Sequence, residues 1–218
     1  IDEWISYYRS GRILMKRFYD NGILDSSKQT LKLYESGALM EQFQEIIIDE
    51  SIMKSGLFRS FYEDGSNKEI GNYKNNNKTG EWVSYYQTGQ KLYSINYQDF
   101  TTNNLINFYY KNGNLFYSCY VGTSFDFNGS FNSYYESGEI MEKGEYDNNL
   151  KDGLWISYYD TGEIFSQINY VDGNGIYSEF FETGEIQVSG YFKNDKKEGT
   201  WISYYLNGNE KQIVEYKD

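Results

Sequence analysis

The chain alternates hydrophobic and polar residues in short stretches, separated at nearly regular intervals by polar, glycine-containing segments. In residues 82–89, WVSYYQTG, successive side chains would project to opposite sides of an extended chain, which is the period-two pattern of a β-strand. Two polar residues and a glycine close the stretch, as in a three-residue hairpin loop whose last residue adopts a left-handed conformation. The chain then returns through a second stretch, for example residues 163–170, EIFSQINY. Each such unit predicts one β-hairpin, and no segment shows sustained helical periodicity.

This hairpin pattern repeats along the whole sequence. Residues 4–11, 82–89, 155–162 and 201–208 are nearly the same phrase, and degenerate copies fill the intervals between them. Nine copies leave no room for a separate domain, so residues 1–218 are predicted to form a single repeat array. The hairpin glycines are 22 to 28 residues apart: Gly11, Gly37, Gly65, Gly89, Gly113, Gly138, Gly162, Gly184 and Gly208.

An isolated hairpin is marginally stable in water, so neighbouring copies are expected to pair edge to edge. The predicted fold is all-β: an elongated, twisted, single-layer antiparallel sheet of about nine tandem β-hairpins. The composition supports it, because aromatic residues make up 20% of the chain and proline is absent. Large rings would cover the backbone of a sheet that has no second layer.

Pairing across the three-residue loop gives a prediction for the two sides of the sheet. Tyr85 is expected to oppose Lys91, and Val83 is expected to oppose Tyr93. This more aliphatic side, which also carries Ile95, is predicted to be the inner, structural side.

The opposite side is predicted to be half-buried or to meet a partner, because it mixes indole and phenol rings with hydroxyl groups. Tyrosine-rich and tryptophan-rich surfaces are typical of protein interfaces. The candidate binding residues on this outer side are Trp4, Tyr8, Trp82, Tyr86, Tyr110, Tyr135, Trp155, Tyr159, Trp201 and Tyr205.

The repeated phrase Gly-x-Trp-x-Ser-Tyr-Tyr-x-x-Gly-x-Ile, with a later tyrosine and a period of about 24 residues, resembles the bacterial variant of the MORN repeat. The resemblance covers essentially the whole chain; it is strong around Gly89, Gly162 and Gly208 and weak around Gly37 and Gly65. It implies an elongated single-layer sheet of hairpins. Bacterial proteins of this kind are often labelled YwqK-type antitoxins, and eukaryotic relatives are linked to membranes, dimerisation and scaffolding.

The composition and net charge of the chain limit the partners and metal sites that it can have. The chain has 20 basic and 32 acidic residues and a formal net charge of −12, which disfavours nucleic acid and anionic membranes as partners. Histidine is absent, and Cys119 is the single cysteine, so multi-cysteine and histidine metal sites are excluded. No apolar run approaches the roughly 18 residues that span a bilayer. We expect no cofactor and no metal.

Carboxylates recur beside the hairpin glycines, at Glu136, Glu139, Asp160, Glu163, Glu182 and Glu185. Paired carboxylates can hydrolyse glycosides, and a hydrolase is one hypothesis for this chain. These carboxylates recur at the same positions in successive repeats, and such recurrence instead favours a role as solvated turn residues. With no histidine to activate Cys119, we expect a small buried side chain there and no catalytic residue in the chain.

Two non-catalytic functions remain open. The first is a protein-interaction module, either antitoxin-like or immunity-like or a scaffold, whose acidic surface steers towards a basic, toxin-like partner. The second is a glycan-binding or cell-wall-binding repeat protein that uses aromatic stacking. In choline-binding modules the tryptophan directly precedes the tyrosine pair, whereas here two residues separate them, as in Trp155-Ile156-Ser157-Tyr158.

The ends of the array carry further expectations. An open sheet ends in unpaired backbone, so self-association through sheet edges is expected, in particular at the first copy, which begins at Trp4. The chain begins at Ile1, so residues upstream of it can be missing. The bacterial cytoplasm and the cell surface both suit a chain without a disulfide framework.

Overall fold

The structure is a computed structural model that describes residues 2–97, 104–122, 126–194 and 196–217. Every regular element within these ranges is a β-strand, and none of them contains a helix that could cross a membrane. The nineteen strands form an open antiparallel sheet in hairpin succession. The predicted fold class, an all-β sheet of tandem hairpins, is confirmed.

Contacts divide the chain into two compact units. Unit 1 consists of residues 1–101 and 111–113, and unit 2 consists of residues 102–110 and 114–218. The strands of unit 1 are β1 (Asp2–Tyr7), β2 (Ile13–Asp20), β3 (Ile23–Leu24), β4 (Gln29–Leu33), β5 (Leu39–Ile48), β6 (Ser51–Phe61), β7 (Asn67–Lys74), β8 (Asn77–Tyr85) and β9 (Lys91–Tyr97). The strands of unit 2 are β10 (Asn104–Tyr109), β11 (Leu115–Val121), β12 (Phe127–Tyr134), β13 (Ile140–Asp147), β14 (Leu150–Tyr158), β15 (Ile164–Val171), β16 (Asn174–Phe180), β17 (Ile186–Lys193), β18 (Lys196–Tyr204) and β19 (Glu210–Tyr216).

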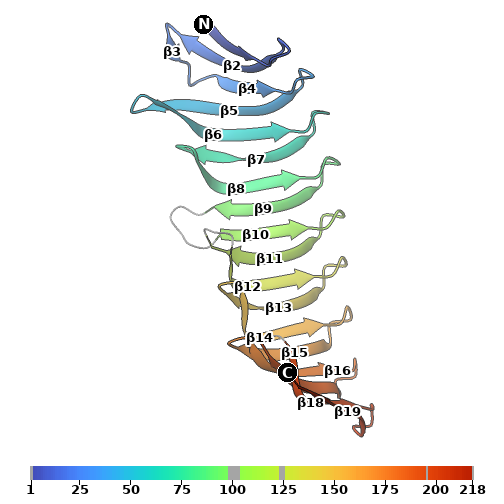
Figure 1. Cartoon of the computed structure of the whole chain (residues 1–218). Helices are drawn as coiled ribbons and strands as arrows, with labels where there is room; N and C mark the ends of the chain where they lie inside the picture. The colour runs from blue at the N-terminus through green and yellow to red at the C-terminus, as the bar shows by residue number, and fades with distance from the viewer. Residues whose placement is uncertain (1, 98–103, 123–125, 195, 218) are drawn as a thin grey trace. The chain divides into compact units, whose positions relative to one another are not determined.

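Within each unit the hairpin loops follow one another along one edge of the sheet (Figure 1). The loop between β8 and β9 shows why the glycine recurs. The Tyr86 amide donates to the Gln90 carbonyl at 2.8 Å, and the Gly89 amide donates to the Tyr86 carbonyl at 2.9 Å. This closure places Gly89 at φ 93°, a conformation that glycine adopts without steric cost.

The connectors at the other edge are tighter than the sequence suggests. Asn75 and Asn76 both have positive φ, 51° and 67°, and they alone join β7 to β8. Asparagine tolerates this conformation better than most residues, which suits a two-residue turn. Residues 77–80 therefore belong to β8, although their sequence is polar and ends in a glycine.

The predicted register is correct at the loop and wrong beyond it. Tyr85 pairs with Lys91 as predicted, but Val83 pairs with Ser94, because a β-bulge between Ser84 and Tyr85 shifts the register by one residue. As a result Trp82 pairs with Ile95 and lies on the same side of the sheet. The assignment of Ile95 to the side opposite Trp82 was therefore wrong.

Candidate functional site

Three of the tryptophans predicted to lie on an outer binding side are buried. Trp82, Trp155 and Trp201 expose 1%, 2% and 4% of their surface, which is less than the 9% exposed at Val83 on the other side. The tryptophan side is thus the more deeply buried one, and the prediction of the inner side was wrong. Trp4 differs: it is 46% exposed, and the Arg17 guanidinium lies 5.6 Å from its ring centre.

Each buried tryptophan lies flat over a glycine of the neighbouring hairpin. A Cβ atom on Gly144 would come within 2.2 Å of Trp155 Cδ2, so only glycine leaves room for this ring. The indole Nε1 of Trp155 donates to the Glu145 carbonyl at 3.0 Å, which satisfies its only donor. The same arrangement joins Trp82 to Gly71, and Trp201 to Gly190.

Aromatic stacking links the hairpins on this side of the sheet. The ring centre of Trp82 is 5.3 Å from that of Phe58 in the preceding hairpin, and Trp155 is 5.6 Å from Phe131. Tyr73 approaches Trp82 edge-on, with ring centres 4.9 Å apart. Such pairs add stability beyond the area that they bury. The aromatic residues in these clusters join one repeat to the next.

Lysine side chains lie over the same tryptophan rings. Lys78 Nζ is 3.8 Å from the ring centre of Trp82, and Lys151 Nζ is 3.7 Å from that of Trp155. Each ammonium is also held by a carboxylate: Lys78 Nζ lies 2.8 Å from an oxygen of Glu69. Since glycine backbone and a lysine cover these rings, a planar ligand has no free indole face on which to stack.

The predicted tyrosines connect successive hairpins through their hydroxyl groups. Tyr135 donates to the Tyr158 carbonyl at 2.6 Å, and Tyr159 donates to the Phe180 carbonyl at 2.8 Å. Partial desolvation raises the pKa of Tyr159, so its hydroxyl keeps its proton at neutral pH. Tyr8 and Tyr110 donate to the carbonyls of Leu33 and Tyr134 in the same way. Tyr86 is half-buried, and Tyr205 is 53% exposed.

A buried ion pair in unit 1 was not predicted. Glu45 is only 5% exposed, and its carboxylate accepts hydrogen bonds from Arg17 Nε and Nη2 at 2.8 and 2.9 Å. The Thr30 hydroxyl donates a third bond at 2.6 Å. The hydrogen bonds to the Glu45 carboxylate raise the pKa of Arg17. Thr30 occupies the position that tryptophan holds in other copies. This departure from the repeat was the only sign in the sequence that polar groups replace the buried indole there.

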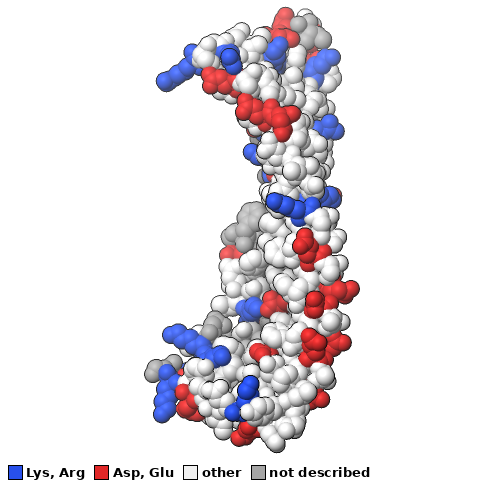
Figure 2. Space-filling view, turned by 90° about the vertical axis from the view of Figure 1, so that its right-hand side faces the viewer, with Lys and Arg blue, Asp and Glu red and all other residues white. Residues whose placement is uncertain are grey.

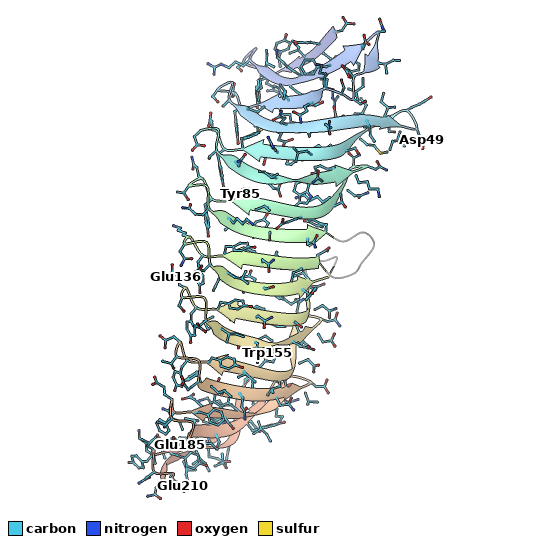
Figure 3. All side chains as sticks on the ribbon, turned by 180° about the vertical axis from the view of Figure 1, so that it is seen from behind. Asp49, Tyr85, Glu136, Trp155, Glu185 and Glu210 are labelled. Atoms are coloured by element: carbon cyan, nitrogen blue, oxygen red, sulfur yellow. The ribbon has the colours of Figure 1, made fainter. Side chains whose placement is uncertain are left out.

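Exposed carboxylates form a continuous feature of unit 2, which we name the acidic turn edge. Glu136, Glu185 and Glu210 lie on the same edge of the sheet in Figure 3, and Figure 2 shows acidic atoms following one another along one side of the C-terminal half. Six members come from three consecutive hairpin loops and the seventh, Glu210, begins β19; all are exposed: Glu136, Glu139, Asp160, Glu163, Glu182, Glu185 and Glu210.

Hydrogen bonds stabilise the charged form of two carboxylates of the acidic turn edge. A hydrogen bond from the Thr161 side chain, together with a backbone amide, lowers the pKa of Glu163, and Thr183 does the same for Glu185. The surrounding composition enhances the negative potential. Residues 102–218 contain 18 acidic and 8 basic side chains, against 14 and 12 in residues 1–101.

The carboxylates and the single cysteine that could carry catalytic or metal chemistry lie in the described part of the chain. The carboxylates beside the glycines are solvated turn residues, and no cluster of three or more potential metal ligands occurs among the residues that the structure describes. Cys119 is 1% exposed, and burial raises the pKa of its thiol to about 12. A thiol in that state is a poor nucleophile.

Comparison with known proteins identifies the class. The sequence profile of the MORN repeat variant matches residues 54–75, 78–99, 127–148, 151–172, 174–194 and 197–218, which is more than half of the chain. The chain therefore belongs to the MORN repeat variant family. Among curated proteins, none matches the sequence significantly.

Similarity to solved structures is weak. A holotoxin pore from Photorhabdus luminescens aligns with 97% of the chain at 10% identity and a TM-score of 0.19. The chain spans only 16% of that protein. A porin-like protein from Bacteroides uniformis aligns with 85% of the chain, over 86% of its own length, at 9% identity and a TM-score of 0.21. Neither likeness bears on the function of this chain.

Proposed function

We propose that this MORN repeat protein is a non-catalytic protein-interaction module whose acidic turn edge docks a basic partner protein. The observation that carries the proposal is the run of six exposed carboxylates on three consecutive hairpin loops of unit 2, which Glu210 continues at the start of β19. The loop segments 135–139, 159–163 and 181–185 contain no lysine or arginine.

The spacing of the loops makes this edge act as one electrostatic surface. Neighbouring strands lie about 4.8 Å apart, so successive hairpin loops are about 10 Å apart. That distance is close to the Debye length at about 0.1 M salt, so the potentials of adjacent loops add. A basic partner would be steered to the edge and held in register along it.

The finer form of the proposal is an antitoxin-like or immunity-like role, with a basic toxin as the partner. It is supported by the surplus of acidic residues in residues 102–218. A scaffold that gathers a basic partner uses the same surface. The covered tryptophan rings favour this edge over aromatic stacking as the mode of binding.

The experiment is a quantitative pull-down from the native cell with the whole chain as bait. The test variant combines Glu139→Gln, Glu163→Gln and Glu185→Gln on the acidic turn edge. The matched control combines Glu35→Gln, Glu50→Gln and Glu63→Gln in unit 1, which changes the net charge equally. We expect wild type and control to recover the same basic protein and the test variant to lose most of it.

Two results would contradict the proposal. One is that wild type recovers no protein above a bead control. The other is that both variants lose the partner equally, because the net charge alone would then account for binding.

A further inference from the structure

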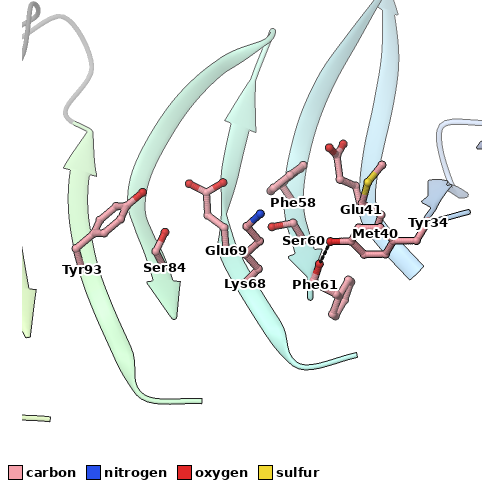
Figure 4. A pocket seen from close by; sticks show the side chains of 10 residues that line it. All are labelled: Tyr34, Met40, Glu41, Phe58, Ser60, Phe61, Lys68, Glu69, Ser84 and Tyr93. Atoms are coloured by element: carbon pink, nitrogen blue, oxygen red, sulfur yellow. Dashed lines mark hydrogen bonds between the residues drawn. The ribbon is translucent and has the colours of Figure 1, made fainter. Parts of the chain in front are cut away.

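A pocket of about 420 Å³ opens within unit 1 on the tryptophan side of the sheet, near the hairpin loops (Figure 4). A volume of this order is typical of sites that hold small molecules. Its lining combines carboxylates, hydroxyls and half-buried or buried aromatic rings. The residues on which the argument rests are Glu41, Ser60, Phe61, Glu69, Ser84 and Tyr93.

The strand register brings these polar residues into one row across five strands. Glu41 on β5 pairs with Ser60 on β6, and Ser60 pairs with Glu69 on β7. Glu69 pairs with Ser84 on β8, and Ser84 pairs with Tyr93 on β9. Directly paired residues share one side of a sheet, so carboxylates and hydroxyls alternate along the pocket. Serine is small, and the two serines leave the space between the larger side chains.

The carboxylates of the pocket are already neutralised by lysines. Lys78 Nζ lies 2.8 Å from Glu69, and Lys32 Nζ lies 3.1 Å from Glu41. Lys54 Nζ also lies 3.8 Å from Glu41 Oε2, and desolvation lowers the pKa of this lysine. An additional ligand cation would meet these ammonium groups, and a ligand anion would meet the carboxylates. Lys68 also lines the pocket, so charges of both signs surround the cavity, and a polar ligand without a charge avoids repulsion from either sign.

A buried oxygen of Glu41 is the observation that points to a ligand. Glu41 lines the pocket, and its Oε2 atom is buried without a hydrogen-bond partner among the described residues. The Ser84 hydroxyl, on a residue that is 8% exposed, lies between Glu69 and Tyr93 in Figure 4, on the side of the sheet that faces the pocket. Buried polar groups are normally hydrogen-bonded, so an unsatisfied carboxylate oxygen beside a cavity fits a site that a hydroxyl-bearing ligand completes.

We propose that this pocket binds a neutral sugar ring. Sugar hydroxyls would donate to the oxygens of Glu41 and Glu69 and exchange hydrogen bonds with Ser60 and Ser84, while the apolar ring face packs on Phe61 or Tyr93. This site lies in unit 1 and is separate from the acidic turn edge. It adds a ligand to the proposed function and does not depend on it.

The test is a calorimetric titration of the whole chain with three neutral disaccharides: maltose, cellobiose and N,N′-diacetylchitobiose. We expect saturable binding of at least one of them. Ser84→Ala should weaken it about three- to tenfold, which corresponds to the loss of one hydrogen bond. The matched control is Ser157→Ala, which removes the hydroxyl at the same repeat position in unit 2. Phe61→Leu is a second variant that removes a ring and keeps the hydroxyls.

Thermal unfolding of each variant shows whether it is folded. The proposal is overturned if none of the three disaccharides binds, or if Ser84→Ala and Ser157→Ala weaken binding equally. It is also overturned if glucuronic acid binds more tightly than glucose, because the ligand class would then be anionic. The triple glutamine variant of the acidic turn edge should bind sugar like wild type, so failure of one proposal is distinguishable from failure of the other.

Discussion

At the scale of single residues, tryptophan and glycine work as pairs that join neighbouring hairpins. Trp155 occupies the space that a side chain on Gly144 would need, and its indole donates to the next carbonyl. Lys151 lies over the ring, 3.7 Å from its centre. The tryptophans are the most recognisable residues of the repeat, and the buried ones in this chain stabilise the sheet.

Gly144→Ala should destabilise the protein by about 1–3 kcal/mol, because the added methyl group must displace the Trp155 ring. The measurement is the urea midpoint of unfolding. The control repeats the substitution in a Trp155→Leu background, where the smaller side chain leaves room and the cost of the methyl group should largely disappear. An equal cost in both backgrounds would show that the tryptophan contact is not the cause.

Arg17→Met should cost about 3–5 kcal/mol, because it leaves the buried Glu45 carboxylate without its counter-charge. The double variant Arg17→Met with Glu45→Met should recover most of that stability, since no unpaired charge remains. Both are compared with wild type by urea unfolding. A double variant no more stable than Arg17→Met alone would contradict this account.

At the scale of the hairpin, a tyrosine just before the loop donates its hydroxyl to a carbonyl of the following hairpin. The bond recurs with the same geometry at Tyr8, Tyr34, Tyr62, Tyr110, Tyr135 and Tyr159. It fixes the spacing of successive loops, and therefore the spacing of the carboxylates that the loops of unit 2 carry.

Tyr135→Phe should lower the free energy of unfolding by about 1 kcal/mol, the typical worth of one hydrogen bond. The matched control is Tyr205→Phe, because Tyr205 holds the same repeat position and is more than half exposed. The control should leave the urea midpoint unchanged. Equal effects at the two positions would show that the bond does not stabilise the junction between hairpins.

Much of this hairpin architecture could be predicted from the sequence, because period two and the loop glycine are local signals. The sequence could not show which side of the sheet is the more deeply buried one. A bulge at Ser84 and Tyr85 adds one residue to β9, and the residue pattern does not show where a bulge occurs. The position of Lys78 over Trp82 could not be predicted either, because residues four apart on a regular strand are about 13 Å apart and an irregularity between Thr79 and Val83 shortens β8 there. The acidic loops were visible in the sequence, whereas the pocket depends on register across five strands.

At the scale of the whole molecule, buried ionisable groups make the protein less stable as the pH becomes alkaline. Burial raises the pKa of Cys119 from 9.0 and that of Tyr117 from 10.0, each to about 12. The unfolded chain loses these protons at lower pH than the folded chain, so ionisation favours unfolding. Their stabilising contribution is complete below about pH 9 and is lost as the pH rises towards 12.

The urea midpoint should therefore fall between pH 9 and pH 12, and Cys119→Ala should make that fall shallower. The same burial predicts that a thiol reagent labels Cys119 only after unfolding. A midpoint that is constant across this range, or rapid labelling of the folded protein at pH 8, would contradict the burial of these groups.

The acidic turn edge also belongs to this larger scale, because its potential arises from three loops and the start of β19 together. The most direct test of its role is the salt dependence of the dissociation constant for the basic partner recovered from the cell. We predict that affinity falls steeply as salt rises, and that the fall is much shallower in the Glu139→Gln, Glu163→Gln, Glu185→Gln variant. An affinity that is unaffected by salt, or an equally steep fall in wild type and variant, would contradict docking through this edge.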